Sequence, residues 1–217
     1  MDKADKRRYG KLAALAVSFL LSFPSGAAEL QTGDLLFCVG GGSAMSEAIV
    51  SSTSSESQLS FDHVALYYEN AEGEGRVIEA SPSKGVIEVA LEDFLKEAEL
   101  IDCHPGVVAK RLTIDFPIRQ VVENARSLIG LPYDWTYLPD NERIYCSELI
   151  YEAFRDAEGQ RIFIASPMNF RNERGELPLF WQELFQKEGV PVPEGELGTN
   201  PNDMSRDPRL KEVYRFF

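Results

Sequence analysis

Three short runs of apolar and β-branched residues follow one another closely in the first half of this chain. The first run is FDHVALYY at 61–68, and the next two cover 76–80 and 85–89. The intervening segments, 70–75 and 81–84, contain Gly, Asn, Ser and Pro, which favour turns. Strands joined by such short connections lie side by side. The pattern therefore predicts a small β-sheet, against which the other elements must pack.

Helical patterns surround these strands. Pro117, an apolar stripe at 118–129 and Gly130 predict a helix, and further helices are expected at 45–50, 91–98, 146–157 and 179–187. Short strands are expected at 33–37 and 107–114, and loops or extended segments at 51–60, 131–145 and 191–207. Gly40-Gly41-Gly42 lacks the ending of a phosphate-binding loop, so we interpret it as a flexible connection. Strands, a helix, a strand and then helices indicate the α+β class.

The N-terminal segment has the pattern of a secretory signal peptide. A basic stretch at 2–11 precedes an apolar run at 12–23 that is short for a bilayer, and small residues follow at 24–28. We expect cleavage after Ala28, with an uncleaved membrane anchor as the alternative. The predicted organisation is a signal peptide at 1–28 and a single domain at 29–217, exported to the periplasm or secreted, with no stable membrane insertion after cleavage.

The charge balance restricts the partners of the chain. The net charge is −13, and removal of residues 1–28, with five basic and two acidic side chains, makes it −16 and leaves 189 residues. That length suits one domain with a sizeable core. Such an acidic surface argues against nucleic acid and anionic lipid headgroups as general partners.

Cys146 opens the helix-like run YCSELIYEAF. On a helix it shares a face with Leu149, Ile150 and Ala153, so the thiol points toward the sheet. The partial positive charge of a helix N-terminus favours a thiolate. A small buried core residue is the alternative interpretation, because free cysteine is commonly buried.

His63 is the candidate base for this thiol. It shares a strand face with Ala65, whereas its neighbour Asp62 is expected on the opposite face and should not orient the ring. Glu79 lies in the adjacent predicted strand and is the better orienter, with Glu88 as a weaker candidate. The alternatives are a core histidine bonded to backbone and an exposed strand glutamate. A thiol at a helix start and an imidazole on a strand together indicate a cysteine nucleophile and its base.

His104 is the other histidine of the chain. It precedes Pro105-Gly106, so we expect it on a surface turn. Cys103 can pair with Cys38 in a disulfide, or both can be buried thiols, and the sequence leaves this open. There is no CxxC motif and few histidines, so no metal and no cofactor are expected.

Aromatic residues precede the candidate nucleophile. Tyr133, Trp135 and Tyr137 either line a substrate cleft or form a loop packed on the core. We expect Tyr133 and Tyr145 to contact substrate. The backbone N–H of Cys146 is the expected oxyanion donor.

Taken in order, six segments resemble the circularly permuted papain-like amidases of the YiiX/YaeF type, relatives of the NlpC cell-wall peptidases. They span most of residues 31–213 and are GDLLF (33–37), DHVALYY (62–68), VIEASPSKGV (77–86), LPYDWTYL (131–138), YCSELIYEAF (145–154) and GTNPNDMSRDPRL (198–210). Papain-like enzymes ordinarily place Cys before His, whereas here His63 precedes Cys146, as permutation would produce.

The resemblance implies a permuted, NlpC-like α+β fold with a small antiparallel sheet or partial barrel packed against helices. It implies Cys146 as nucleophile, His63 as base and Glu79 as third member of a triad. The expected activity is hydrolysis of an amide bond in a peptide or small amide, with peptidoglycan-derived peptides as the candidate substrate. One alternative is an acyltransferase or esterase like lecithin-retinol acyltransferase, although Glu79 replaces the second histidine of that group. The other is a binding module for a small amino compound.

Overall fold

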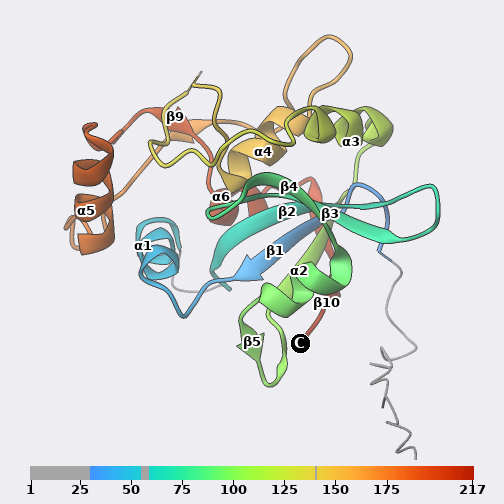
Figure 1. Ribbon diagram of the computed structural model, residues 1–217, viewed down its shortest axis with the longest axis horizontal. Helices are drawn as coiled ribbons and strands as arrows, with labels where there is room; N and C mark the ends of the chain where they lie inside the picture. Colours follow the sequence, from blue (N-terminus) through green and yellow to red (C-terminus); the bar gives the residue numbers. More distant parts are fainter. Residues whose placement is uncertain (1–29, 55–58, 140) are drawn as a thin grey trace, which may run out of the picture.

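The computed structural model describes residues 30–54, 59–139 and 141–217. The predicted signal peptide at 1–28 lies outside the described residues. An antiparallel sheet forms the centre of the fold, with helices on both of its faces (Figure 1). The predicted α+β class is therefore confirmed.

The central sheet has six strands in the spatial order β10-β7-β1-β2-β3-β4, and every neighbouring pair is antiparallel. Its strands are β1 (Leu35–Val39), β2 (Phe61–Glu69), β3 (Gly75–Ser81), β4 (Gly85–Ala90), β7 (Val107–Leu112) and β10 (Leu210–Arg215). The sheet stays open and does not close into a barrel. Strands β2 and β3 are direct neighbours, so their side chains on one face lie next to each other.

Helices and short strands complete the described part of the chain. The helices are α1 (Ala44–Thr53), α2 (Leu91–Glu97), α3 (Ile118–Ser127), α4 (Cys146–Ala153), α5 (Leu179–Glu188) and α6 (Pro201–Ser205). The short strands are β5 (Leu100–Ile101), β6 (His104–Pro105), β8 (Ser166–Pro167) and β9 (Leu197–Gly198), which pair as β5 with β6 and β8 with β9.

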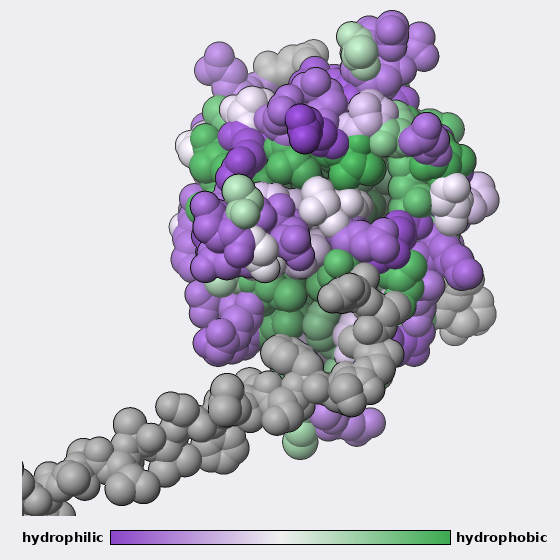
Figure 2. Space-filling view, turned by 90° about the vertical axis from the view of Figure 1, so that its right-hand side faces the viewer, coloured by the Kyte–Doolittle hydropathy of each residue, from purple (hydrophilic) through white to green (hydrophobic). Residues whose placement is uncertain are grey.

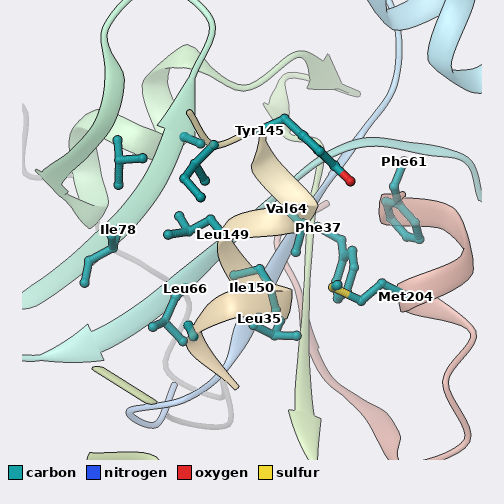
Figure 3. Packing of buried hydrophobic residues seen from close by; sticks show 14 of the residues in the cluster. Leu35, Phe37, Phe61, Val64, Leu66, Ile78, Tyr145, Leu149, Ile150 and Met204 are labelled. Atoms are coloured by element: carbon teal, nitrogen blue, oxygen red, sulfur yellow. The ribbon is translucent and has the colours of Figure 1, made fainter. Parts of the chain in front are cut away.

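Side-chain alternation along the strands divides the core between the two faces of the sheet. On one face, Phe37 and Val64 pack with Leu149 and Ile150 of α4 (Figure 3). On the other face, a second cluster packs against Phe94 of α2. Each fully buried apolar side chain contributes about 1.5–3 kcal/mol to folding. These contacts hold α4, and with it the start of that helix, in a fixed position on the sheet.

One predicted boundary was wrong near α1. The loop expected at 51–60 begins later, because α1 continues to Thr53. The hydroxyls of Ser51 and Thr53 donate to the carbonyls of Ala48 and Ile49, so these polar residues are satisfied inside the helix. In the glycine run, Gly40 packs closely on α1, since a Cβ there would collide with the side chain of Val50.

Helix α4 ends at Ala153 and not at the predicted residue 157. Phe154 leaves the helix and is fully buried, which turns the chain away. Asp156 then forms a turn in which its Oδ1 accepts from the backbone N–H of Gln160 at 2.7 Å. Tertiary burial therefore overrides the helical pattern of the local sequence.

The C-terminal third contains elements that the sequence did not predict, among them a helix and a strand of the central sheet. Helix α6 lies within 191–207, where Asn200 caps it by accepting from the N–H of Asp203 and Pro201 occupies its first turn. Strand β10 extends the sheet beside β7, with Leu210 opposite Leu112. The strand predicted at 107–114 is β7, which ends two residues earlier, at Leu112.

One face of the molecule is largely hydrophilic (Figure 2). Figure 2 shows one face of the molecule, on which hydrophilic residues predominate and hydrophobic residues form smaller patches between them. Among the residues that the structure describes, none of the helices combines the length and apolar character needed to cross a membrane.

Candidate active site

Cys146 is the first residue of α4, as predicted. Tyr145 precedes it as the N-cap, and the backbone N–H of Tyr145 donates to Glu148 Oε2 at 3.3 Å, which anchors the first turn. Backbone N–H groups in the first turn have no intrahelical partner, so the Cys146 N–H is available to a ligand oxygen. Only 5% of Cys146 is exposed, and its side chain lines a cavity.

His63 and Glu79 meet across β2 and β3. His63 Nε2–H donates to Glu79 Oε2 at 2.8 Å, and the two side chains are 18% and 17% exposed. The ring of His63 also packs beside Phe94 of α2, with 6.2 Å between ring centroids. Because Nε2 is engaged, Nδ1 is the ring nitrogen that remains for the Cys146 thiol, which lines the same cavity. The structure thus brings Cys146, His63 and Glu79 together.

These contacts set the charge of the imidazole. Burial lowers the pKa of His63, but the hydrogen bonds to Cys146 and Glu79 and their negative charge outweigh it and raise the pKa from 6.5 to about 10. The imidazolium is therefore the dominant form at neutral pH. A positive charge beside the sulfur stabilises a thiolate, and the ring holds a proton that it can deliver to a departing group.

Asp62 does not point away from the site, contrary to the expectation from strict alternation. Cys38 of β1 pairs with His63, whereas Val39 pairs with Phe61, so Asp62 is the extra residue of a β-bulge. A bulge changes the direction of a side chain beside it. Asp62 consequently lines the same cavity as His63.

Asn202 of α6 secures the strand just before this bulge. Its Oδ1 accepts from the N–H of Phe61 at 2.7 Å, and its Nδ2 donates to the Phe61 carbonyl and to Thr53 Oγ1, each at 2.8 Å. Asn202 is 1% exposed. The sequence alone assigned no role to Asn202. It lies in the segment GTNPNDMSRDPRL, which was noted only for its resemblance to the family.

Tyr133 and Tyr145, which were predicted to contact substrate, also lie next to Cys146. Tyr133 is buried, contacts the ring of Trp135 and lines cavities on both sides of Cys146. The Tyr145 hydroxyl accepts from the backbone N–H of Thr199 at 3.1 Å. Thr199 in turn donates from Oγ1 to Ser147 Oγ at 3.0 Å. The aromatic loop therefore both packs on the core and borders the site, so the two interpretations of it are compatible.

The remaining thiols and the second histidine have different surroundings. Cys38 lies near the site, where burial first and then the charges of Asp62, Glu79 and Cys146 raise its pKa well above the usual range. Cys103 and His104 are exposed in the β5–β6 hairpin. All three cysteines are free thiols, so the disulfide alternative for Cys38 and Cys103 was wrong, and so was the alternative that both are buried, because Cys103 is exposed.

The described fold and this arrangement define a class of protein. A thiol at a helix N-terminus, an imidazole on a neighbouring strand and a carboxylate behind the ring are the groups of a papain-like cysteine hydrolase, here with His before Cys in the chain. Comparison with known families agrees. Residues 29–214 match the family described as "permuted papain-like amidase enzyme, YaeF/YiiX, C92 family", and the chain belongs to this family. The predicted family and an amidase-type hydrolase activity are thereby confirmed.

Two Escherichia coli proteins are similar to this chain. The uncharacterized protein YiiX of strain K12 is 24% identical over 203 residues, which cover 92% of this chain and 93% of that protein. A crystal structure described as metalloprotein yiiX, from Escherichia coli O157:H7, superposes with a TM-score of 0.68 and 23% identity. That alignment covers 85% of this chain and 97% of the other. This structural likeness shows the fold.

The description of that relative as a metalloprotein prompts a test of the residues present here. Within 30–54, 59–139 and 141–217, no group of three or more His, Cys, Asp or Glu side chains is arranged to hold a metal ion. His63 is engaged by Glu79 and Cys146 and so offers no free nitrogen. The chemistry below therefore uses side chains alone.

Proposed function

We propose that this protein is an exported cysteine amidase that cleaves an amide bond in a cell-wall peptide. Cys146 is the nucleophile, His63 the acid and base, and Glu79 the residue that orients the ring. The observation that carries this proposal is that the His63 imidazole bonds to the Glu79 carboxylate and lines one cavity together with Cys146.

The first half of the reaction forms a thioester. The Cys146 thiolate attacks the amide carbonyl carbon, and the backbone N–H of Cys146 stabilises the negative oxygen that develops. When the carbon–nitrogen bond breaks, the His63 imidazolium donates its proton to the departing nitrogen. The amine leaves, the acyl group stays on sulfur, and His63 becomes neutral.

The second half restores the enzyme. Neutral His63 accepts a proton from water, whose oxygen attacks the thioester carbonyl. The carbon–sulfur bond breaks, the carboxylic acid leaves, and the thiolate–imidazolium pair is regenerated. Glu79 keeps Nε2 engaged throughout, so Nδ1 faces the reacting groups.

Export and the cell-wall substrate rest on the sequence. The basic, apolar and small-residue order of residues 1–28 supports cleavage and release outside the cytoplasm. An amidase at that location meets the peptides of the cell wall, and the resemblance to NlpC peptidases favours the same substrate. Determining the N-terminus of the protein recovered from the periplasm tests this part, with Glu29 as the expected first residue.

Turnover by variants tests the chemistry. Wild type, Cys146→Ala and His63→Ala are incubated with muropeptides and simple amides, and Cys103→Ala serves as control because that thiol is exposed and remote from the cavity. Loss of turnover in the first two variants, with retention in the control, is expected. A thioester adduct of peptide mass on Cys146 would identify the acyl group. Equal turnover by wild type and Cys146→Ala would refute the proposal, and a fatty-acyl adduct from phospholipid would favour acyl transfer instead.

A further inference from the structure

Two cavities meet at the candidate nucleophile. Cys146, Tyr133 and Ile49 line both of them. The larger has a volume of about 270 Å³ and also contains His63. The smaller has a volume of about 50 Å³, is bordered by the indole of Trp181, and is not lined by His63. A substrate whose carbonyl reaches the sulfur can therefore extend in two directions.

The larger cavity is acidic. Asp62, Glu79, Glu97 and Glu99 line it, and among its described lining residues there is no Lys or Arg. Glu79 is already engaged by His63, which is the one basic side chain among the described lining residues. The other three carboxylates therefore face the cavity without a cationic side chain of their own. An ammonium group entering this space gains from their attraction, whereas a carboxylate is repelled.

The backbone is shaped to bring two of these carboxylates to the cavity. The bulge in β2 directs Asp62 into it, and Ser46 lines the cavity beside Asp62. Burial raises the pKa of Asp62, and the bond to Ser46 and the charge of His63 act in the opposite direction. Gly42 has no Cβ, and any Cβ there would collide with the Glu99 carboxylate. The glycine run thus provides space for an acidic group at the cavity.

The smaller pocket is uncharged. Its described lining contains none of Lys, Arg, His, Asp and Glu. Burial raises the pKa of Tyr133, Tyr137 and Tyr145 further above neutrality, so their hydroxyls stay protonated. A charged group placed there would lose its hydration without gaining a counter-ion.

Two buried polar atoms belong to residues of this pocket. Trp181 Nε1 and Ser52 Oγ have no hydrogen-bond partner within the described chain, and Trp181 is 3% exposed. Leaving such atoms unpaired costs about 1–3 kcal/mol each, so a polar substrate atom that reaches either of them is favoured. Since a water-sized group needs about 10–15 Å³ of such volume, the pocket holds about four heavy atoms.

We propose that the substrate lies across Cys146 with a positively charged leaving amine in the acidic cavity and a short, uncharged acyl side chain in the aromatic pocket. This inference rests on the proposed function. The direction follows from the chemistry, because the departing nitrogen takes its proton from His63 and must lie on the side that His63 lines. The acyl group that stays on sulfur then occupies the other side.

Matched leaving groups test the acidic cavity. The substrates are N-acetylalanyl amides of 1,3-diaminopropane, butylamine and β-alanine, which present a positive, a neutral and a negative group at similar length. We expect kcat/KM for the cationic amide to exceed that for the butylamide by about tenfold, and the anionic amide to be poorest. Asp62→Asn and Glu99→Gln should each lower this preference, whereas Glu72→Gln, in the exposed turn between β2 and β3, should leave it unchanged.

Matched acyl groups test the aromatic pocket. With 1,3-diaminopropane as the common leaving amine, N-acetylthreonyl and N-acetylvalyl substrates differ in a hydroxyl and are nearly identical in shape. We expect a threefold to tenfold preference, roughly, for threonyl, and its loss in Trp181→Phe, which keeps a ring but removes the N–H. N-acetylglutamyl and N-acetylphenylalanyl substrates should be cleaved poorly because of charge and size.

The outcomes separate the two proposals. Cleavage that depends on Cys146 but is equal for cationic, neutral and anionic leaving amines would overturn the assignment of the acidic cavity and leave the amidase function standing. Faster cleavage of glutamyl or phenylalanyl substrates than of threonyl would overturn the assignment of the aromatic pocket. Equal turnover by wild type and Cys146→Ala would overturn the proposed function, and this inference with it.

Discussion

Asn202→Ala tests the clamp that holds the start of β2. The asparagine side chain makes three hydrogen bonds, two of them to the backbone of Phe61 and one to Thr53. Phe61 is 3% exposed, so its N–H and carbonyl would lose these partners where water has little access. At about 1–3 kcal/mol for each buried group left unpaired, the free energy of unfolding should fall by about 3–5 kcal/mol.

Urea denaturation measures this loss. With an m-value of about 2 kcal/mol/M, the unfolding midpoint should fall by about 2 M. Gln120→Ala is the control, because Gln120 is exposed and its side chain makes a single hydrogen bond, to Asn124 at 3.0 Å, and its substitution should change stability by less than about 0.5 kcal/mol. Amidase activity should also fall in Asn202→Ala under native conditions, since the clamp adjoins the bulge that precedes His63. If the free energy of unfolding of Asn202→Ala falls by less than about 1 kcal/mol and activity is retained, strand pairing alone is enough to hold the bulge, and the clamp is refuted.

Two further substitutions address the charge of the site and the core beneath it. His63 keeps its proton up to a pH of about 10, so wild-type kcat/KM should decline as pH rises through that value, and Glu79→Gln should move this decline to lower pH by about one to three pH units. The raised pKa of His63 also stabilises the folded state in full below its unfolded pKa of 6.5, and this contribution is lost as pH rises through about 10. An unshifted alkaline decline in Glu79→Gln would contradict the contact at 2.8 Å. Phe154→Ala should lower the free energy of unfolding by about 3–5 kcal/mol because Phe154 is fully buried, whereas Leu179→Ala, at a residue 66% exposed, should change it little in the same urea titration.

Much of the site could be predicted from the sequence because its residues lie in regular elements. The strand patterns placed His63 and Glu79 on neighbouring strands, and the helix-like run placed Cys146 at a helix start. The structure brings these three residues together, and their catalytic roles stay a prediction. The α+β class followed from the same periodicity, because alternating and helical patterns were both strong.

The sequence did not reveal features that depend on contacts distant along the chain. The bulge at Asp62 arises from pairing with Cys38 and Val39, which no local pattern shows. Asn202 acts 141 residues away from Phe61. The early end of α4 is likewise a consequence of burying Phe154, and short elements such as α6 carry too few residues to show a periodicity.

The central claim is that the His63 imidazolium activates the sulfur of Cys146. Its most direct test is the rate of alkylation of Cys146 by iodoacetamide at pH 6, followed by peptide mass spectrometry in wild type and His63→Ala, with the exposed Cys103 in the same samples as the reference thiol. The wild-type Cys146 should react faster than Cys103, and the variant should lose at least about tenfold in that ratio. Equal ratios in the two proteins would contradict the claim.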